Sequence, residues 1–251
     1  MRLYLLPLGF TRVDKGRVLT PGIGEGEPID TPVWAALLDS PVGWVLIDTG
    51  MHPVHIQDPD ATFRGTPNEG LIQPVMTEAD TVVNRLAEVG LTPGDLRYVV
   101  NTHLHFDHCG GNASVADSAT FLVQHAEYEA AEELPEEYNP RDYAPAGVTY
   151  EFLEGPYTLC PGVELIPTPG HTLGHQSVLV RLDARTVILP ADAIVLREIL
   201  DGVQGVWRDP DAGAESVRRL VDLAETENAE LLISHDPEVW AQWPHAPKPF
   251  V

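Results

Sequence analysis

The sequence predicts a mixed α/β fold in which two groups of strands form a sandwich with helices outside. Three observations predict it. Short strand-like runs recur along the chain, helical patterns come between some of them, and the strands fall into one group before about Phe121 and one after it. The 251 residues are enough for a full core, and no linker-like stretch divides them, so we expect a single domain over residues 1–251.

The spacing of apolar residues places the elements. Runs rich in aliphatic and β-branched side chains predict strands at residues 3–8, 33–38, 44–48, 98–101, 120–123, 163–167, 177–182, 186–189 and 231–234. Apolar residues at helical spacing predict helices at 77–89, 125–133 and 214–226. Thr77 is expected to cap the first helix and Gly90 to end it.

Two long segments between these elements look irregular. Residues 51–76 contain four prolines and residues 134–148 contain three, which argues against regular structure in either. Loops of this length in a compact domain are usually functional, so we expect them to form walls of a substrate site. The alternative is a contact between two copies of the chain in a homodimer.

One short run between Asn101 and Gly111 carries three histidines and an aspartate. They are His103, His105, Asp107 and His108. In an extended segment residues two apart point the same way, so the first two histidines can hold one ion together. The aspartate and the third histidine converge on a second ion only if the chain turns tightly after His105, which the two glycines that follow would permit. The run therefore predicts two pairs of ligands, one per metal.

Three further candidate ligands stand beside turn residues or at the end of apolar runs: His171, Asp192 and His235. Five histidines and two carboxylates are enough for two divalent ions. This ligand set suits zinc best, although cobalt, manganese or iron would accept it. The remaining histidines are expected to be ordinary core or surface residues, but His52 and His175 lie near site segments and could support the ligands from behind.

The ligand run and the three later ligands resemble the signature of the metallo-β-lactamase superfamily. The resemblance extends over essentially the whole chain and includes residues 46–50 and 168–175. It is closest to the lactonases that open N-acyl homoserine lactones, whose phrase N-x-H-L-H-F-D-H-x-G-G-N is matched from Asn101 to Asn112. The resemblance implies an αββα sandwich of two mixed β-sheets flanked by helices.

The resemblance also implies a role for each ligand. The first metal would be held by His103, His105 and His171, the second by Asp107, His108 and His235, and both by a bridging Asp192. Asp48 matches an aspartate that supports the ligands without binding metal. The lactonases usually carry a tyrosine three residues after the bridging aspartate, and this chain departs from them with Val195.

The implied reaction is hydrolysis of a lactone ring. A hydroxide between the two ions would attack the carbonyl carbon, and Asp107 would pass the proton to the departing alkoxide. Phe106 resembles a substrate-lining residue of the lactonases. For further substrate contacts, including an apolar wall along an acyl chain, we expect Phe63, Met51, Ile194 and Val195.

The composition indicates which partners and which cell compartment to expect. Thirty-eight acidic against fifteen basic residues give a formal charge of −23, which repels phosphate backbones and anionic lipid surfaces, so neither nucleic acid nor a membrane is an expected partner. Two cysteines, Cys109 and Cys160, cannot make a disulfide framework and favour a reducing cytoplasm. The apolar stretch at the N-terminus is interrupted by Pro7 and is expected to be a first strand.

Two other functions remain open at this stage. One is a metallo-hydrolase of the same superfamily with broader specificity, acting on other lactones, esters, thioesters or phosphoesters. The other is a metal-binding protein without catalysis, which would bind ions but turn over no ester. A β-lactamase is disfavoured, because those enzymes generally lack an aspartate that bridges both ions and this chain offers Asp192.

Overall fold

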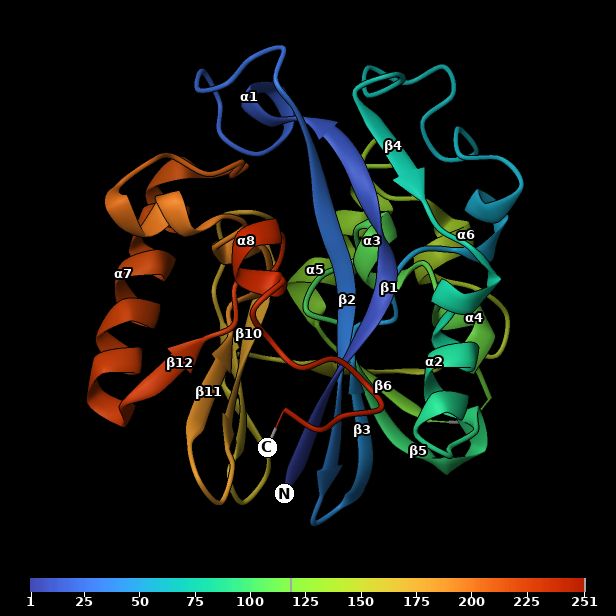
Figure 1. Ribbon diagram of the computed structural model, residues 1–251, viewed down its shortest axis with the longest axis vertical. Helices are drawn as coiled ribbons and strands as arrows, with labels where there is room; N and C mark the ends of the chain where they lie inside the picture. Colours follow the sequence, from blue (N-terminus) through green and yellow to red (C-terminus); the bar gives the residue numbers. More distant parts are fainter. Residues whose placement is uncertain (118, 251) are drawn as a thin grey trace.

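The computed structural model describes residues 1–117 and 119–250, and its core is a sandwich of two mixed β-sheets. Figure 1 shows the two sheets side by side, with helix α7 outside one and helix α2 outside the other. Side chains from both sheets form the central apolar cluster, for example Leu5 and Val45 from the first sheet with Leu165 and Val178 from the second. The αββα architecture expected from the sequence is confirmed.

The first sheet has seven strands in the order β4-β1-β2-β3-β5-β6-β7. Strands β1 to β4 pair antiparallel, whereas β3, β5, β6 and β7 run parallel. Their bounds are β1 Arg2–Asp14, β2 Pro28–Ser40, β3 Gly43–Ile47, β4 Ile72–Val75, β5 Leu96–Val100, β6 Thr120–Gln124 and β7 Tyr150–Leu153.

The second sheet has five strands in the order β12-β11-β10-β9-β8. All neighbours are antiparallel except β11 and β12, which are parallel. Their bounds are β8 Tyr157–Cys160, β9 Val163–Pro167, β10 Gln176–Arg181, β11 Thr186–Leu189 and β12 Ala229–Leu231.

Helices cover the outer faces of both sheets. Val217 and Leu220 of α7 pack in one apolar cluster with Ile188 of the second sheet, and Leu86 of α2 packs in another with Leu46 of the first. The helices are α1 Lys15–Val18, α2 Val82–Glu88, α3 Phe106–Cys109, α4 Asn112–Val115, α5 His125–Glu133, α6 Pro140–Tyr143, α7 Pro210–Glu227 and α8 Pro237–Trp240. Short 3-10 turns are η1 Pro53–Ile56, η2 Glu78–Asp80, η3 Pro93–Asp95, η4 Ala191–Ala193 and η5 Arg197–Asp201. Among the described residues no helix has the length and apolar character needed to cross a membrane.

The expected division of the strands near Phe121 is wrong. Strand β6 pairs with β5 through Val100 and Leu122, and β7 pairs with β6, so both belong to the first sheet. The change of sheet falls after Leu153, where β7 ends. Strands β4, β7 and β8 have only four residues each and escaped the prediction. The last predicted strand lies earlier than expected, although Leu232 N still donates to Ile188 O at 2.8 Å.

The predicted helix at 125–133 is confirmed as α5, and the other two differ at their starts. Thr77 caps the 3-10 turn η2 rather than an α-helix, because Thr81 is extended and begins α2 as a new cap. Helix α7 starts at Pro210, since the side chain of Asp209 accepts hydrogen bonds from the backbone N–H groups of Asp211 and Ala212.

Candidate metal centre

Seven side chains meet where several strands of the two sheets end. The loop after β5 carries His103, the loop between β9 and β10 carries His171, Asp192 follows β11, and His235 follows β12. All seven predicted ligands, His103, His105, Asp107, His108, His171, Asp192 and His235, belong to the groups of side chains brought together here. Loops at strand ends can present side chains from distant parts of the chain because the sheets fix their starting points.

A tight turn after His105 brings the next ligands inward. His105 is extended, with φ −71° and ψ 156°, and serves as the N-cap of α3, which begins at the next residue. The glycines have a different purpose from the one expected, because Gly110 itself has ordinary helical dihedral angles. A Cβ there would lie 2.4 Å from the backbone nitrogen of His52, and one at Gly111 would lie 2.2 Å from the carbonyl oxygen of Thr49. The glycines therefore let the neighbouring loop approach closely.

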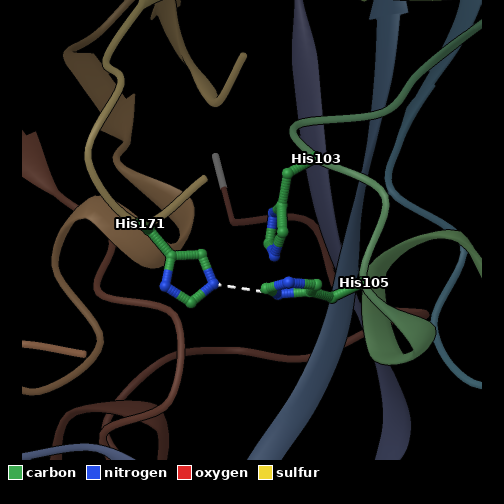
Figure 2. Close-up of side chains that lie close together, drawn as sticks. All are labelled: His103, His105 and His171. Atoms are coloured by element: carbon green, nitrogen blue, oxygen red, sulfur yellow. Dashed lines mark hydrogen bonds between the residues drawn. The ribbon is translucent and has the colours of Figure 1, made fainter. Parts of the chain in front are cut away.

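Three histidines form the first group. His103, His105 and His171 each offer a ring nitrogen, and these atoms lie within 4.8 Å of one another. Figure 2 shows the three rings pointing toward one another, with His171 Nε2 and His105 Nδ1 3.0 Å apart. His103 Nε2 is buried and has no hydrogen-bond partner within residues 1–117 and 119–250. The three rings therefore present their nitrogens toward a common point.

Asp107, His108 and His235 form the second group, again with donor atoms within 4.8 Å of one another. The carboxylate of Asp192 lies between the two groups. Its Oδ1 is 3.3 Å from His108 Nε2 and 3.2 Å from His235 Nε2, and its Oδ2 is 3.4 Å from His171 Nε2. One oxygen of the same carboxylate thus faces each group, as a bridging ligand requires.

Acceptors behind three of the rings fix which nitrogen faces the centre. The Nδ1 atoms of His108, His171 and His235 lie 2.8 Å from Asp48 Oδ2, 2.7 Å from Val206 O and 2.9 Å from Pro32 O. Since a carboxylate or carbonyl oxygen can only accept, each Nδ1 carries a proton, and in the neutral ring each Nε2 keeps its lone pair for the centre. Asp48 thus lies behind the ligands, where the resemblance placed it.

The electrostatics differ between the two groups of histidines. Burial works against charge on His108 and His235, but the neighbouring Asp192 and Asp107 outweigh it and raise the pKa of both rings. Burial lowers the pKa of His103 and of His105 well below the ordinary value, and neighbouring imidazoles add to the effect. Burial works against the charge of Asp192, but His235 and His108 outweigh it and hold the pKa of its carboxyl well below its usual range. Neutral imidazoles and a carboxylate are the forms in which these side chains bind metal.

The residues present fit a pair of divalent ions. Among the described residues His103 Nε2 finds no hydrogen-bond partner although it is buried, which is costly in a protein interior unless another ligand satisfies it. Imidazole nitrogens and carboxylate oxygens together are typical ligands of zinc and similar metals.

A cavity of about 380 Å³ opens from the centre toward the surface. Phe63 and Phe106 line it, with their rings edge to face at 4.8 Å between centroids. Glu137 contributes from residues 134–148, so both irregular segments supply wall residues as expected. The sequence did not point to the rest of the wall, which comes from α1 and its surroundings and from the segment after η5: Thr11, Val13, Arg17, Val18, Leu19, Val206, Trp207 and Arg208.

Three predicted substrate contacts do not line this cavity. Ile194 and Val195 are buried in the apolar cluster that includes Leu220 of α7, and Val195 is only 1% exposed. Met51 is buried in the cluster on the outer face of the first sheet, where it packs against Gly9. In each case the apolar side chain is buried in the core and does not face the cavity.

Sequence reasoning missed Glu127, which ties two ligand loops together. This fully buried carboxylate of α5 accepts from Leu104 N at 2.9 Å, between the first two histidines. Its other oxygen accepts from Thr172 Oγ1 at 2.6 Å and Gly174 N at 3.1 Å, beside His171. Helix α5 contains several glutamates, and nothing in the sequence marks this one.

His175 was noted only as a residue near the site, and the structure buries it completely against the ligands. Its ring centroid is 5.2 Å from that of His103 and 6.1 Å from that of His171. Burial, with a smaller effect of His171, lowers the pKa of His175 to about 3, so the ring is neutral. His52 instead accepts a hydrogen bond from Val54 N and caps η1.

Comparisons with known proteins agree with this geometry. The family model of the metallo-β-lactamase superfamily matches residues 28–235. An N-acyl homoserine lactonase from Bacillus sp is 40% identical over 242 residues, which cover 94% of each chain. The N-acyl homoserine lactonase AttM of Agrobacterium fabrum (strain C58) is 31% identical in an alignment of 262 positions that covers 99% of this chain and 98% of the relative.

A solved structure extends the similarity to the whole fold. It is an N-acyl homoserine lactone hydrolase with the product N-hexanoyl-L-homoserine bound at its catalytic metal centre. It matches with a TM-score of 0.92 and 36% identity over 99% of this chain and 98% of the other. The chain therefore belongs to the metallo-β-lactamase superfamily, and within it to the family of the N-acyl homoserine lactonases.

Proposed function

We propose that this protein is a metal-dependent hydrolase that opens the lactone ring of N-acyl homoserine lactones. The observation that carries the proposal is the carboxylate of Asp192, which presents one oxygen to each of two groups of donor atoms at the base of a cavity. The identity of its relatives supports the substrate, since lactonases match this chain over nearly its whole length.

Two ions of zinc are the cofactor that this donor set favours. Following the two groups, the first ion would be held by His103, His105 and His171 and the second by Asp107, His108 and His235, with Asp192 available to both. When bound, such a pair supplies hydroxide near neutral pH and stabilises negative charge that develops on a carbonyl oxygen.

Asp107 is the proton carrier in this mechanism. Its Oδ2 lies 3.9 Å from His108 Nε2 and 3.7 Å from His235 Nε2, and the residue lines the cavity. Hydrolysis adds OH to the carbonyl carbon and H to the ring oxygen while the bond between them breaks. A carboxylate at this position accepts the proton that water loses and delivers it to the ring oxygen as that oxygen leaves.

The cavity wall suits an acyl chain. Phe63 and Phe106 form an aromatic edge beside the donor atoms, and Leu19, Ile72 and Trp207 extend the apolar surface. Burying methylene groups against such a wall is favourable at about 0.8 kcal/mol per group. We therefore expect the acyl group of the substrate to extend outward from the centre along this wall.

The test is a substrate panel combined with metal analysis. Wild-type protein is expected to hold two ions per chain and to hydrolyse homoserine lactones faster than plain γ- and δ-lactones, a thioester or a β-lactam, measured by proton release. Asp192→Asn should lose bound metal, and kcat/KM should fall at least about a thousandfold. Preference for a substrate that is not a lactone would overturn the substrate assignment, and an active metal-free protein would overturn the mechanism.

A broader-specificity hydrolase of the same superfamily remains the alternative, because the chain has Val195 in place of the lactonases' usual tyrosine and the position is buried. The same panel distinguishes the two, since a broad enzyme would turn over several ester classes at similar rates. A cytoplasmic location, a homodimer and a single domain over the whole chain stay predictions from the sequence.

A further inference from the structure

The turn that presents Asp192 contains a backbone conformation that needs support. Ala191, directly after Pro190 and before Asp192, has a φ of 46°, in the left-handed region that residues with a side chain rarely adopt. This turn must nevertheless hold its position closely, because the carboxylate that follows faces both groups of donor atoms. The contacts on either side of Ala191 should therefore show what holds the turn in place.

A chain of hydrogen bonds connects the two ends of this turn. The backbone N–H of Asp192 donates to His175 Nε2 at 3.1 Å, and His175 Nδ1 lies 2.9 Å from Thr168 Oγ1. Thr168 Oγ1 lies 2.8 Å from Ser177 Oγ, which donates to the carbonyl oxygen of Pro190 at 3.0 Å. We call this set of four hydrogen bonds the relay. It starts at Asp192, directly after Ala191, and ends at Pro190, directly before it.

The direction of every bond in this chain is fixed by its ends. Asp192 N–H can only donate, so His175 Nε2 accepts and the proton of the neutral ring is on Nδ1. Pro190 O can only accept, so the hydroxyl hydrogen of Ser177 is committed there. Thr168 must then accept from His175 and donate to Ser177, and one arrangement of protons satisfies all four bonds.

We propose that His175, Thr168 and Ser177 are positioning residues that hold the Ala191 turn and so aim the Asp192 carboxylate at both ions. The inference rests on the proposed metal centre and adds to it a device outside the ligand set. All three side chains are almost completely buried, and the polar atoms of their side chains are hydrogen-bonded within the relay. Losing one of these buried hydrogen bonds would leave another polar group without a partner, which is costly. The positions of the three side chains therefore depend on one another.

The packing of the imidazole supports the same role. The His175 ring lies against the rings of His103 and His171, so a change in its orientation would disturb the first group as well. Thr168 is fixed independently, because its backbone N–H donates to the carbonyl oxygen of His175 at 2.8 Å. The relay therefore starts from a rigid loop that already carries one of the ligands.

The test is Thr168→Val, which keeps the shape of the side chain and removes the hydroxyl from the middle of the relay. The proton on His175 Nδ1 then loses its acceptor, and the other tautomer would place two N–H groups face to face at Asp192. We expect the affinity for divalent ions to fall about 10- to 100-fold, measured by chelator competition. The visible absorption spectrum of the cobalt-loaded protein should also change, because the geometry around the ions changes.

Two controls separate positioning from simple loss of stability. Thr168→Ser keeps the hydroxyl and should restore both the affinity and the cobalt spectrum. Thr81→Val removes a different buried hydroxyl, the one that caps α2 on the outer face of the first sheet, and should leave both unchanged. If Thr168→Val does not fold, Ser177→Ala is the gentler variant, because it removes the bonds to Thr168 and to Pro190 O but leaves His175 Nδ1 its acceptor.

The outcomes are distinct from those of the proposed function. If Asp192→Asn loses metal while the folded Thr168→Val and Ser177→Ala proteins bind it with wild-type affinity and spectrum, the relay does not position Asp192 and the inference is overturned. If Asp192→Asn itself retains both ions, the metal centre has been assigned wrongly and the inference falls with it. Weakened binding in the relay variants, with rescue by Thr168→Ser, supports it.

Discussion

The metal centre and the wall of the cavity above it are held in different ways. In the centre, hydrogen bonds from behind fix His108, His171 and His235, and buried Glu127 ties two of the ligand loops together. The wall is assembled from separate segments, and the ion pair between Arg208 and Glu137 that joins two of them is exposed. The ligands of the centre are thus fixed by buried hydrogen bonds, whereas part of the wall depends on a contact that water screens.

The largest effect we expect in the wall concerns His55, which anchors residues 51–76. Its Nδ1 donates to Pro59 O at 3.2 Å and its Nε2 accepts from Thr62 Oγ1 at 3.0 Å, while the ring lies against Phe106. Burial, together with the charge of Arg141, lowers the pKa of His55 to about 4. The neutral ring is thus part of the folded structure.

The sign of the pH dependence follows from that shift. Between about pH 6.5 and pH 4 the unfolded chain binds a proton at this position more readily than the folded chain does, so stability falls as the pH falls through this window. The loss is on the order of 3 kcal/mol in the free energy of unfolding. Urea unfolding of wild type and His55→Gln at pH 7 and pH 4.5 measures it, because the glutamine cannot titrate. Equal losses in both proteins would show that His55 does not contribute.

In the centre, Glu127→Gln should weaken metal binding about 10- to 100-fold. The amide nitrogen must replace one of two oxygens, and at either position it faces a backbone N–H, that of Leu104 or that of Gly174. One ligand loop is therefore released whichever way the amide turns. Metal content and chelator competition provide the measurement.

A matched control is available for this prediction. Asp142 is another buried carboxylate, but it bonds Arg141 rather than a ligand loop. Asp142→Asn should lower the free energy of unfolding without changing the affinity for metal. If the two variants lose metal equally, Glu127 acts through overall stability and the centre is not held more specifically than the wall.

The contrast between the metal centre and the wall also explains which site residues the sequence predicted. Metal chemistry allows few residue types at short spacings, so the run from His103 to His108 and the three later ligands could be predicted, and the structure brings all seven together. The wall could not be predicted in this way. Ile194 and Val195 have the composition of a substrate wall and of a core equally, and only the path of the turn after Asp192 sends them to the core.

Long-range pairing limited the prediction of the fold for a related reason. The sequence of β6 is typical of a strand, and β7 is too short to stand out. Neither local sequence indicates which sheet the strand joins. Parallel pairing of Val100 with Leu122 decides that, and it depends on the path of the intervening ligand loop. Glu127 was missed because its three donors come from two loops that are far apart in the sequence.

The smallest effect concerns the ion pair between Arg208 and Glu137, which spans two wall segments. Both side chains are more than a third exposed, at 36% and 39%, and an exposed pair of this kind contributes about 0–1 kcal/mol. Arg208→Gln should therefore change kcat/KM less than about fivefold and leave metal content untouched. The measurement is kcat/KM for hexanoyl and decanoyl homoserine lactones at low and at high salt. Glu137→Gln, which removes the other partner of the ion pair, is the matched variant. A loss above tenfold confined to the longer substrate would show that this pair shapes the acyl site, and the wall would then be as closely specified as the centre.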